Sequence, residues 1–582
     1  MFTQKTANMV TTIIKIALAV VLVMPMFIMQ TMPVQAGTNV GGPIISDTTW
    51  TLANSPYIVT TSVDVQQNVT LTIEPGVTIR FNSGTKLQVN GELIARGIAD
   101  NLIVFTSNQA NPAPGDWYGI EFTSVAVPVV VDENENYVSG NVIQYCVVEY
   151  AGFEETCAVN ASSLLIDNCT VQNNKGRGVE ISGSDTLPGY VANSVIRNNQ
   201  MGGIFSERAI VRGNTVADNW GTTYGGGIYA KNSELIENRV IGNMAEYSGG
   251  GIFAGKSIVL RNVVENNTSQ KSYSDRGGGG IYATGSTVSQ NIVIANNSMS
   301  YGGGILADGG LLTENIVRDN YVKSIYGGYG GGVYVKGSET FTNTITGNRV
   351  LGSLAGGSGI FVRYFIQGDV LYNTVVNNQG PQDSTSGGIQ FWNTSGTGEN
   401  LQVHYNTFYG NVPYDVSVQS GFDISGTHNY WGTVTNLDIL AQIYDWYDDD
   451  SRGKFLYTPY LQEPSPDAPL PPPTGLSANF QNDSVTLTWD VLPSFITGWG
   501  YKVYYDTDNS LPPFVGIGLN EGDSPINVGD KTSYILTGLD SSSDYYFAVT
   551  AYDNLGNEGW YSNIIARKLG GYWVYLPLVI KK

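Results

Sequence analysis

The feature that most constrains this chain is a short phrase that returns ten times in its central part, between residues 168 and 411. Each copy starts with Asn, carries an apolar or β-branched residue two positions later, and ends with a second Asn five positions after the first. The copies start at Asn168, Asn193, Asn214, Asn238, Asn262, Asn291, Asn315, Asn343, Asn373 and Asn406. Successive copies are 21 to 33 residues apart. Such a period is typical of a solenoid, in which each unit buries its apolar side by stacking on its neighbours.

A second phrase, Gly-Gly-Ile-Tyr-Ala or a close variant, lies between these copies at residues 226–230, 250–254, 279–283, 303–307 and 331–335. Short β-branched runs cut by Gly and Asn predict strands joined by tight turns. Asn suits the corners because it tolerates the left-handed backbone region and bonds to its own main chain. Asn side chains stacked in register would also form a ladder of amide hydrogen bonds. No part of the repeat carries a helical apolar period of useful length.

With these two phrases the chain resembles the right-handed parallel β-helix of the pectate-lyase type. A leucine-rich repeat would need a regular Leu framework, which is missing, and a propeller blade would need a longer period with hairpin turns. Residues 38–125 resemble the opening coils of secreted bacterial β-helix proteins, through the segments 71–77, 87–97, 103–107 and 115–120. The expected fold class is all-β. A β-helix with its caps occupies residues 37–462, and residues 125–136 form an inserted loop or hairpin.

Residues 1–36 are typical of a secretory signal peptide. Lys5 and Lys15 form the positive flank, an apolar run at 16–29 is interrupted only by Pro25, and a small-residue cleavage site ends at Ala36. The alternative is an uncleaved anchor, which the shortness of the apolar run disfavours. We expect a mature chain that begins at Gly37, has no transmembrane helix, and is extracellular or attached to the cell surface.

Three cysteines are present in the sequence, at positions 146, 157 and 169. Cys146 and Cys169 occupy matching places in successive coils, and neighbouring strands lie about 4.8 Å apart. The two side chains are either buried thiols stacked in one core column or a disulfide, and the torsions of a stacked pair favour the thiols. Cys157 remains free in both cases. No zinc-binding or redox spacing is present.

The β-helix is expected to end near residues 429–432. Residues 437–446 predict a short amphipathic helix that caps its apolar end, with Ile439, Leu440 and Ile443 on one face. The proline-rich stretch at 463–471 predicts a stiff linker, so that the flanking domains would be independent of each other.

Residues 472–568 resemble a fibronectin type III domain over nearly their whole length. Three alternating apolar runs support this, and Leu539 followed six residues later by Tyr545 matches the tyrosine corner of such sandwiches. The tail at 569–582 is apolar and resembles the tails of some secreted bacterial surface proteins. It is either a sorting or attachment signal for the cell envelope or a last strand of the sandwich.

Candidate binding residues follow from the stacking of coils, because matching residues of successive coils are neighbours. In Gly-Ile-Tyr-Ala the pleat directs Ile and Ala to the core and Tyr outward. The outward aromatic column supplies the predicted ligand-binding residues Phe205, Tyr229, Phe253, Tyr282, Tyr334 and Phe361. Aromatic rings stack on sugar faces, and a long exposed apolar stripe usually marks a contact surface. The alternative is that these rings stack on one another or lie beneath the long turns.

The next outward column brings Asp308, Lys336 and Arg363 together from consecutive coils, and these are the only catalytic candidates. Polysaccharide lyases of the fold that the chain resembles use a basic side chain to abstract a proton beside a uronate carboxylate, and Lys336 would fit that role. A surface charge ladder is the alternative. No cluster of carboxylates suggests a hydrolase, and no carboxylate motif surrounds His404 or His428. Enzymatic activity is thus uncertain, and the residues favour a protein without it.

Asp445, Asp448, Asp449 and Asp450 form either a calcium site or a solvated turn, and their spacing is not that of a helix–loop–helix calcium loop. No other cofactor is indicated. The net charge of −21 argues against nucleic acid as a partner. We expect a secreted or cell-surface protein that binds a polysaccharide or another surface glycan, in adhesion or a structural role. The alternatives are a polysaccharide lyase or other carbohydrate-active enzyme acting on an acidic glycan, and a surface spacer without a ligand.

Overall fold

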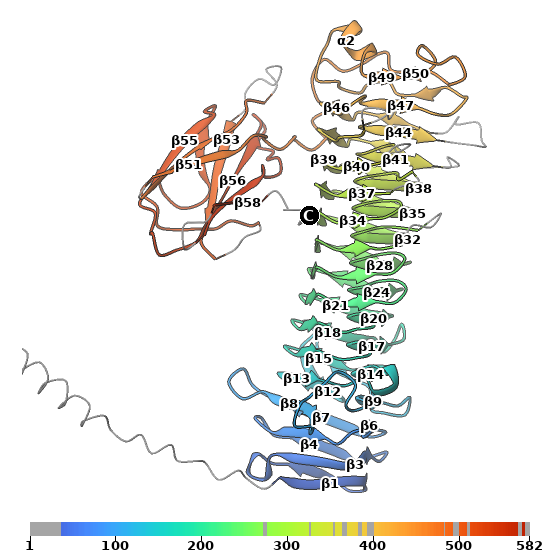
Figure 1. Ribbon diagram of the computed structural model, residues 1–582, viewed down its shortest axis with the longest axis vertical. Helices are drawn as coiled ribbons and strands as arrows, with labels where there is room; N and C mark the ends of the chain where they lie inside the picture. The colour runs from blue at the N-terminus through green and yellow to red at the C-terminus, as the bar shows by residue number, and fades with distance from the viewer. Residues whose placement is uncertain are drawn as a thin grey trace, which may run out of the picture.

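The computed structural model describes residues 37–568, apart from 272–275, 325–326, 353–355, 364–368, 382–386, 393–400, 482, 493–499 and 509–511, and also the strand β58 (Trp573–Leu576). The expected signal peptide at 1–36 and the rest of the C-terminal tail lie outside the described residues. Figure 1 shows a long solenoid with a smaller β-domain beside its C-terminal half. No helix in the described part of the chain is long and apolar enough to cross a membrane.

Each coil adds a short strand to three faces of the solenoid, here named A, B and C, and successive coils pair in parallel. Face A consists of β1 (Thr38–Ile44), β3 (Tyr57–Val65), β6 (Leu87–Val89), β9 (Ile120–Phe122), β14 (Val159–Ala161), β17 (Val179–Ser182), β20 (Ile204–Glu207), β24 (Ile228–Lys231), β28 (Ile252–Gly255), β32 (Ile281–Ser289), β35 (Ile305–Thr313), β38 (Val333–Phe341), β41 (Ile360–Arg363), β44 (Ile389–Trp392), β47 (Val416–Val418) and β49 (Ile443–Tyr444). The strands β32, β35 and β38 continue through the corner into face B, and the first halves of β1 and β3 belong to face C, where β3 pairs with β5.

Face B consists of β2 (Thr48–Trp50), β4 (Thr70–Ile73), β7 (Glu92–Arg96), β12 (Val142–Gln144), β15 (Leu165–Asp167), β18 (Gly189–Ala192), β21 (Ala209–Arg212), β25 (Glu234–Ile236), β29 (Ile258–Leu260), β42 (Val370–Leu371) and β45 (Val403–His404). Face C consists of β5 (Thr78–Phe81), β8 (Ile103–Ser107), β13 (Cys146–Glu149), β16 (Thr170–Gln172), β19 (Val195–Arg197), β22 (Thr215–Ala217), β26 (Arg239–Ile241), β30 (Val263–Glu265), β33 (Ile292–Ile294), β36 (Ile316–Arg318), β39 (Thr344–Thr346), β43 (Thr374–Val376) and β46 (Thr407–Tyr409).

Smaller elements complete the solenoid. A narrow parallel sheet between faces C and A consists of β23 (Trp220–Gly221), β27 (Met244–Ala245), β31 (Thr268–Ser269), β34 (Asn297–Ser298), β37 (Tyr321–Lys323) and β40 (Arg349–Leu351). The expected insertion is an antiparallel hairpin of β10 (Val130–Val131) and β11 (Tyr137–Ser139). Two 3-10 turns, η1 (Leu52–Asn54) and η2 (Phe153–Glu155), and the parallel pair β48 (Ile424–Ser425) and β50 (Phe455–Leu456) complete the set.

The core is built from inward columns of aliphatic residues, as the alternation of the strands predicts. Ile228, Ile252, Ile281 and Ile305 pair in one column and are fully buried, which confirms the predicted register. The Gly-Gly phrase is needed where the coils approach most closely. A Cβ on Gly226 would lie 2.3 Å from the carbonyl oxygen of Met244 in the next coil, so no larger residue fits there.

Two buried asparagine ladders connect the coils. In the first, Asn214 Nδ2 donates to Asn238 Oδ1 at 2.9 Å, and the ladder continues to Asn429. In the second, Asn174 Nδ2 donates to Asn199 Oδ1 at 2.8 Å, and the ladder continues to Asn411. Each amide also donates to a backbone carbonyl of the preceding coil, as Asn214 does to Val191. These amides are therefore satisfied without water, which removes the cost of burying them.

The prediction that every copy begins on a ladder residue is wrong for the first two. Asn168 and Asn193 have positive φ angles of 52° and 47° and occupy the left-handed corner. Their neighbours Cys169 and Ser194 stand in the ladder, where the backbone N–H of Cys169 donates to Ser194 Oγ at 3.0 Å. Both positions favour Asn, one for its backbone and one for its amide, so the sequence phrase is ambiguous by one residue.

The thiols of Cys146 and Cys169 extend this ladder toward the N-terminus. The backbone N–H of Cys146 lies 3.4 Å from Cys169 Sγ, and both residues are buried and unpaired by a disulfide, as is the half-buried Cys157. The stacked thiols that the sequence favours are what the structure has.

At its C-terminal end the solenoid is closed by the short helix α2 (Asn436–Leu440). The predicted helix was longer, over 437–446, and Ile443 instead belongs to strand β49, where it pairs with Val416 and is buried. Ile439 is fully buried, as predicted for a cap on the apolar end.

The C-terminal domain is an antiparallel sandwich. One sheet contains β51 (Ser477–Gln481), β52 (Ser484–Thr488) and β55 (Ser533–Thr537), and the other contains β53 (Gly500–Asp506), β54 (Ile526–Gly529), β56 (Tyr545–Tyr552), β57 (Ile564–Arg567) and β58. The tyrosine corner is formed, because the backbone N–H of Asp540 donates to the hydroxyl oxygen of Tyr545 at 3.0 Å.

Candidate functional site

The outward residues at the centre of the strands of face A form one column along the solenoid. Parallel pairing places them in register from the first coils to the last. The first five are polar and are called the polar segment here: Asp64, Gln88, Glu121, Asn160 and Glu180. The next seven are the aromatic segment: Phe205, Tyr229, Phe253, Tyr282, Leu306, Tyr334 and Phe361. The same position in the fold therefore carries two kinds of surface.

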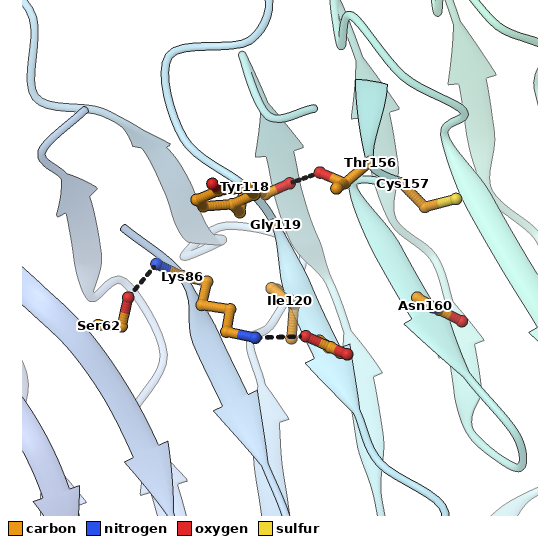
Figure 2. A pocket seen from close by; sticks show the side chains of 9 residues that line it. Ser62, Lys86, Tyr118, Gly119, Ile120, Thr156, Cys157 and Asn160 are labelled. Atoms are coloured by element: carbon orange, nitrogen blue, oxygen red, sulfur yellow. Dashed lines mark hydrogen bonds and ion pairs between the residues drawn. The ribbon is translucent and has the colours of Figure 1, made fainter. Parts of the chain in front are cut away.

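A cavity of about 460 Å³ opens beside the polar segment. Strands β6, β9 and β14 form its floor, and the loop that contains Thr156 forms one wall (Figure 2). Its lining residues are Ser62, Lys86, Tyr118, Gly119, Ile120, Glu121, Thr156, Cys157 and Asn160. A concave site lined by several converging polar groups is the usual form of a ligand pocket.

The charged groups of this cavity are paired with each other. Lys86 Nζ lies 2.6 Å from Glu121 Oε2, and the two side chains keep 32% and 45% of their surface exposed. Tyr118 donates its hydroxyl to Glu154 Oε2 at 3.2 Å and packs edge-on against Phe153. Desolvation and the nearby Glu154 carboxylate raise the pKa of Tyr118, so this hydroxyl stays protonated and remains a hydrogen-bond donor at the rim.

Cys157 is not an active nucleophile in this cavity. Burial raises the pKa of its thiol to about 12, and the Glu180 carboxylate adds to that shift. The thiol donates to Glu180 Oε2 at 3.2 Å, and the same oxygen lies 2.7 Å from Arg177 Nη1. Because the thiolate is the reactive form, the thiol here acts only as a donor that helps to hold Glu180.

Two amides of the polar segment have no partner. Within the described part of the chain, neither the side chain of Gln88 nor that of Asn160 takes part in a hydrogen bond, and Asn160 is exposed at the cavity. They stand on either side of Glu121 in the column. Each amide offers both a donor and an acceptor to a ligand.

The aromatic segment is largely paired with itself. The rings of Phe205 and Tyr229 stack at 5.3 Å, and those of Tyr229 and Phe253 at 4.7 Å with an interplanar angle of 7°. Arg177 lies 5.2 Å from the Phe205 ring and Lys231 lies 5.3 Å from the Tyr229 ring. The ring faces are thus turned toward neighbouring rings and cations, and the half-buried rings of this part offer mainly their edges outward.

Further along, the same column is covered. Tyr334 and Phe361 each expose only 1% of their surface, because Tyr301, Tyr329 and Trp392 pack over them. The sequence analysis expected both rings on an exposed stripe, and for these two that expectation is wrong. The rings of Tyr301, Tyr329 and Trp392 thus form, with Tyr334 and Phe361, a small second core outside the solenoid.

The catalytic candidates are brought together as the register predicts. Asp308, Lys336 and Arg363 pair in consecutive coils, and Lys336 Nζ lies 3.1 Å from Asp308 Oδ2. Arg363 Nη1 donates to the hydroxyl of Tyr334 at 3.2 Å. Both cations are therefore engaged by neighbouring groups of the chain, in the arrangement of a surface charge ladder.

Three of the four aspartates near the C-terminal cap stabilise turns. Asp445 is buried and accepts hydrogen bonds from the backbone N–H groups of Tyr447 and Phe455, at 3.0 and 2.8 Å. Asp448 accepts from the backbone N–H of Asp445, and Asp449 pairs with Arg452. Among the described residues no group of three or more His, Cys, Asp or Glu side chains is placed to hold a metal ion. Asp445, Asp448, Asp449 and Asp450 thus do not converge on one point.

Sequence reasoning did not identify the polar segment, because the inserted hairpin separates Glu121 from Asn160 by 39 residues, well outside the repeat period. The signal that could have found it is the apolar residue directly before each member. Ile120, Val159 and Val179 pair in register with Ile204, and stepping one residue forward from each gives Glu121, Asn160 and Glu180.

Three family models match parts of the chain. They are a right handed beta helix region at residues 155–322, a pectate-lyase like beta helix domain at 42–166 and a fibronectin type III domain at 471–567. Together with the fold described above, these matches confirm the predicted architecture.

Similar proteins match only short stretches. A Kelch domain-containing protein of Saccharolobus solfataricus is 42% identical over 89 residues, which are 15% of this chain and 10% of that protein. Protein bark beetle of Drosophila melanogaster is 42% identical over 73 residues, which are 12% of this chain and 2% of that protein. The chain therefore spans a tenth or less of the length of these two relatives.

Three similar solved structures have TM-scores of 0.30 or less. A periplasmic alginate epimerase has a TM-score of 0.30 and 13% identity, with 71% of this chain and 84% of that chain covered. A tailspike protein of E. coli bacteriophage HK620 has a TM-score of 0.25 and 11% identity, with 88% and 86% covered. An Fn3-like protein from Clostridium thermocellum is 26% identical, with a TM-score of 0.13, and covers 16% of this chain and 88% of its own.

Proposed function

We propose that this chain, a right-handed parallel β-helix followed by a fibronectin type III domain, binds a polysaccharide along face A, with the polar segment as its main contact. The observation that carries the proposal is the pair of open amides, Gln88 and Asn160, on either side of Glu121 in the column. Glu121 and Asn160 line the cavity described above. An adhesive or structural role follows from such binding.

The chemistry of the polar segment suits a carbohydrate. A sugar presents hydroxyl groups that both donate and accept hydrogen bonds, and an amide side chain offers an acceptor and a donor to match them. The carboxylate of Glu121 accepts from a hydroxyl, and the hydroxyls of Tyr118 and Thr156 lie at the cavity rim. A ligand that buries these polar groups without pairing them loses binding free energy. The site therefore selects against such ligands.

The length of face A suits a polymer. Equivalent side chains of successive coils recur every ~4.8 Å along the axis, so a chain of sugars lying parallel to the axis meets a new outward side chain at each coil. Individually weak contacts then add through multivalency. The half-buried rings of Tyr229 and Tyr282 extend this surface beyond the polar segment.

The proposal also places the mature protein outside the cell or at its surface. This part rests on the signal-like segment at residues 1–36. N-terminal sequencing of the protein collected from culture medium and from washed cells tests it, with Gly37 expected as the first residue. A protein retained in the cytoplasm with an intact N-terminus would contradict it.

The binding proposal is tested by screening the intact protein on immobilised polysaccharides and measuring the dissociation constant of the best one. The double variant Gln88→Ala/Asn160→Ala should weaken binding by about tenfold or more, since two hydrogen bonds contribute about 1 kcal/mol each. Gln172→Ala is the control, because Gln172 is an outward amide on face C, away from the proposed contact, where it bonds to Glu149 and Arg197.

Unchanged affinity of the double variant would contradict the proposal, as would an equal loss in the Gln172→Ala control. The same screen includes an assay for unsaturated products. Release of such a product by the parent and its loss in Lys336→Ala would instead support a lyase centred on Asp308, Lys336 and Arg363.

A further inference from the structure

A change of burial along face C indicates that another part of the chain covers its C-terminal half. The first outward residue of each strand is half-buried in the earlier coils, as for Thr215 and Arg239. The equivalent residues Thr344, Thr374 and Thr407 expose 1%, 0% and 1%. These are still polar side chains on an outward-facing pleat, so the solenoid itself does not bury them.

The covering segment is the proline-rich linker. Thr374 Oγ1 donates to the carbonyl oxygen of Pro469, and Ala468 and the prolines at 471–473 are buried. A spacer of the extended polyproline type is expected to be solvated on all sides. The stretch that the sequence predicts to be a free-standing linker is instead in contact with β43 through Thr374.

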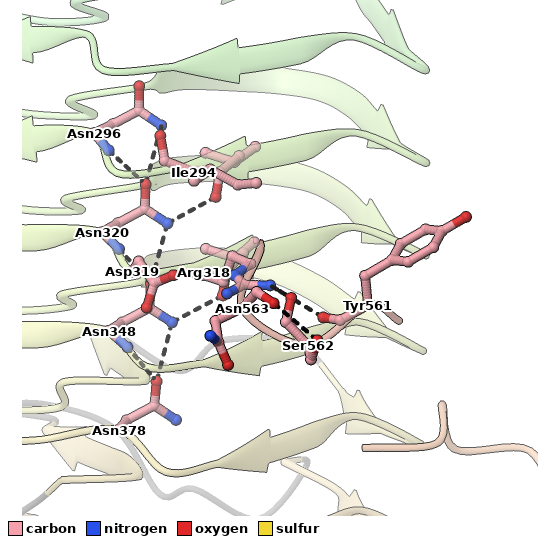
Figure 3. Close-up of polar contacts among 12 residues, drawn as sticks. Ile294, Asn296, Arg318, Asp319, Asn320, Asn348, Asn378, Tyr561, Ser562 and Asn563 are labelled. Carbon is pink, nitrogen blue, oxygen red and sulfur yellow. Dashed lines mark hydrogen bonds and ion pairs between the residues drawn. The ribbon is translucent and has the colours of Figure 1, made fainter. Parts of the chain in front are cut away.

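A second outward position on face C carries the contact with the C-terminal domain itself. Arg318, at the end of β36, donates from Nη1 to the backbone carbonyl oxygens of Tyr561 and Ser562 at 3.1 and 3.0 Å (Figure 3). Its Nε donates to Asp319 Oδ2 at 3.0 Å, and its side chain is only 14% exposed. A guanidinium held from both ends in this way is a charge-assisted, oriented contact.

The acceptors of Arg318 belong to a fixed part of the C-terminal domain. Ser562 is buried, and its Oγ accepts the backbone N–H of Val549 on β56 at 3.0 Å. The next residue, Asn563, bonds through its amide to both the N–H and the carbonyl of Leu476, where the domain leaves the linker. The contact of Arg318 is therefore connected through Ser562 to the sandwich core, and through Asn563 to the junction with the linker.

We infer that the fibronectin type III domain is docked on face C of the solenoid, where Arg318 binds its backbone carbonyl oxygens and Thr374 binds the linker that leads to it. The two domains then move as one body, contrary to the independence that the sequence suggested. Figure 1 shows the domain on the side of the solenoid away from the labelled strands β24, β28, β32 and β35. Docking on face C thus leaves the proposed ligand face open.

Small-angle X-ray scattering of the intact chain tests the docking. The parent should scatter as a single rigid particle with the domain at the flank of the solenoid. Arg318→Glu places a carboxylate against two carbonyl oxygens. Thr374→Arg places a larger side chain where Thr374 contacts the linker. Each should shift the radius of gyration and the maximum dimension to larger values, while circular dichroism retains the β-sheet signal.

The matched control is Arg197→Glu. Arg197 occupies the same outward column of face C in an earlier coil, where it is exposed and bonds to Gln172, so its replacement should leave the scattering unchanged. The docking inference is overturned if the parent already requires an ensemble of domain positions. It is also overturned if both interface variants scatter like the parent, or if Arg197→Glu expands the particle as much as they do.

Discussion

The two segments of the outward column on face A occupy equivalent places in the fold and differ in what they do with them. In the polar segment the side chains pair across coils only in part, as Lys86 does with Glu121, and amides are left open beside a cavity. In the aromatic segment the rings stack on each other and are then covered by the turns around Tyr301 and Tyr329.

The difference shows that the register of a solenoid fixes where a side chain stands and leaves open whether it binds or packs. Aromatic rings on neighbouring coils stack on one another, because their spacing of about 5 Å is close to a stacking distance. Amides and carboxylates at the same spacing retain unused donors and acceptors. A stripe of aromatic residues along a β-helix is therefore weaker evidence for a ligand than open polar groups at the same positions.

The largest expected effect is the loss of stability when a buried ring of the aromatic segment is removed. Tyr334→Ala removes a fully buried ring and should lower the free energy of unfolding by about 3–5 kcal/mol, the usual cost of truncating a buried aromatic residue. Tyr229→Ala, in the same column but half-buried, should cost about 1 kcal/mol. Urea titration followed by circular dichroism measures both. Equal effects of the two variants would mean that the two parts of the aromatic segment are packed alike.

A second prediction concerns the buried carboxyl of Asp415, toward the end of the solenoid opposite the polar segment. Asp415 ends the second asparagine ladder, where its Oδ1 accepts from Asn411 Nδ2 at 2.7 Å and its Oδ2 is buried without a partner among the described residues. Burial raises the pKa of Asp415 to about 7, against an ordinary value of 3.8.

The raised pKa makes the folded state the stronger proton binder. The contribution of Asp415 to stability is therefore complete below about pH 4 and is lost as the pH rises through about 7. Asp415→Asn imitates the protonated form, so its advantage over the parent should grow by up to about 4 kcal/mol between these pH values. Urea midpoints at several pH values test this, and parallel pH profiles of parent and variant would contradict it.

The smallest expected effect concerns the half-buried rings of Tyr229 and Tyr282. Tyr229→Ala/Tyr282→Ala should weaken polysaccharide binding by less than the amide double variant, by about threefold, because only ring edges and hydroxyls are lost. The dissociation constant measures this directly. A loss larger than that of Gln88→Ala/Asn160→Ala would shift the main contact to the aromatic segment.

The sequence predicts the parts of this molecule that depend on period and alternation. The Ile228 column and the outward aromatic column follow from a repeated phrase and a two-residue pleat. The burial of Tyr334 depends instead on rings in the turns, and the contact of Arg318 depends on a domain more than 200 residues away. Neither leaves a periodic signal. The polar segment could not be recognised by its period, because the inserted hairpin interrupts the repeat. The ladder position of the Asn168 copy was predicted one residue too early, because two adjacent positions both favour Asn.

The most direct test of the binding account is a lysine footprint of the intact protein, with and without the polysaccharide that the screen identifies. Amine acetylation read by mass spectrometry compares Lys86, which pairs with Glu121 of the polar segment, with Lys231 beside the aromatic rings, and exposed Lys256 serves as the internal reference. The account predicts strong protection of Lys86, weaker protection of Lys231 and none of Lys256. Protection of Lys231 with Lys86 unchanged would contradict it.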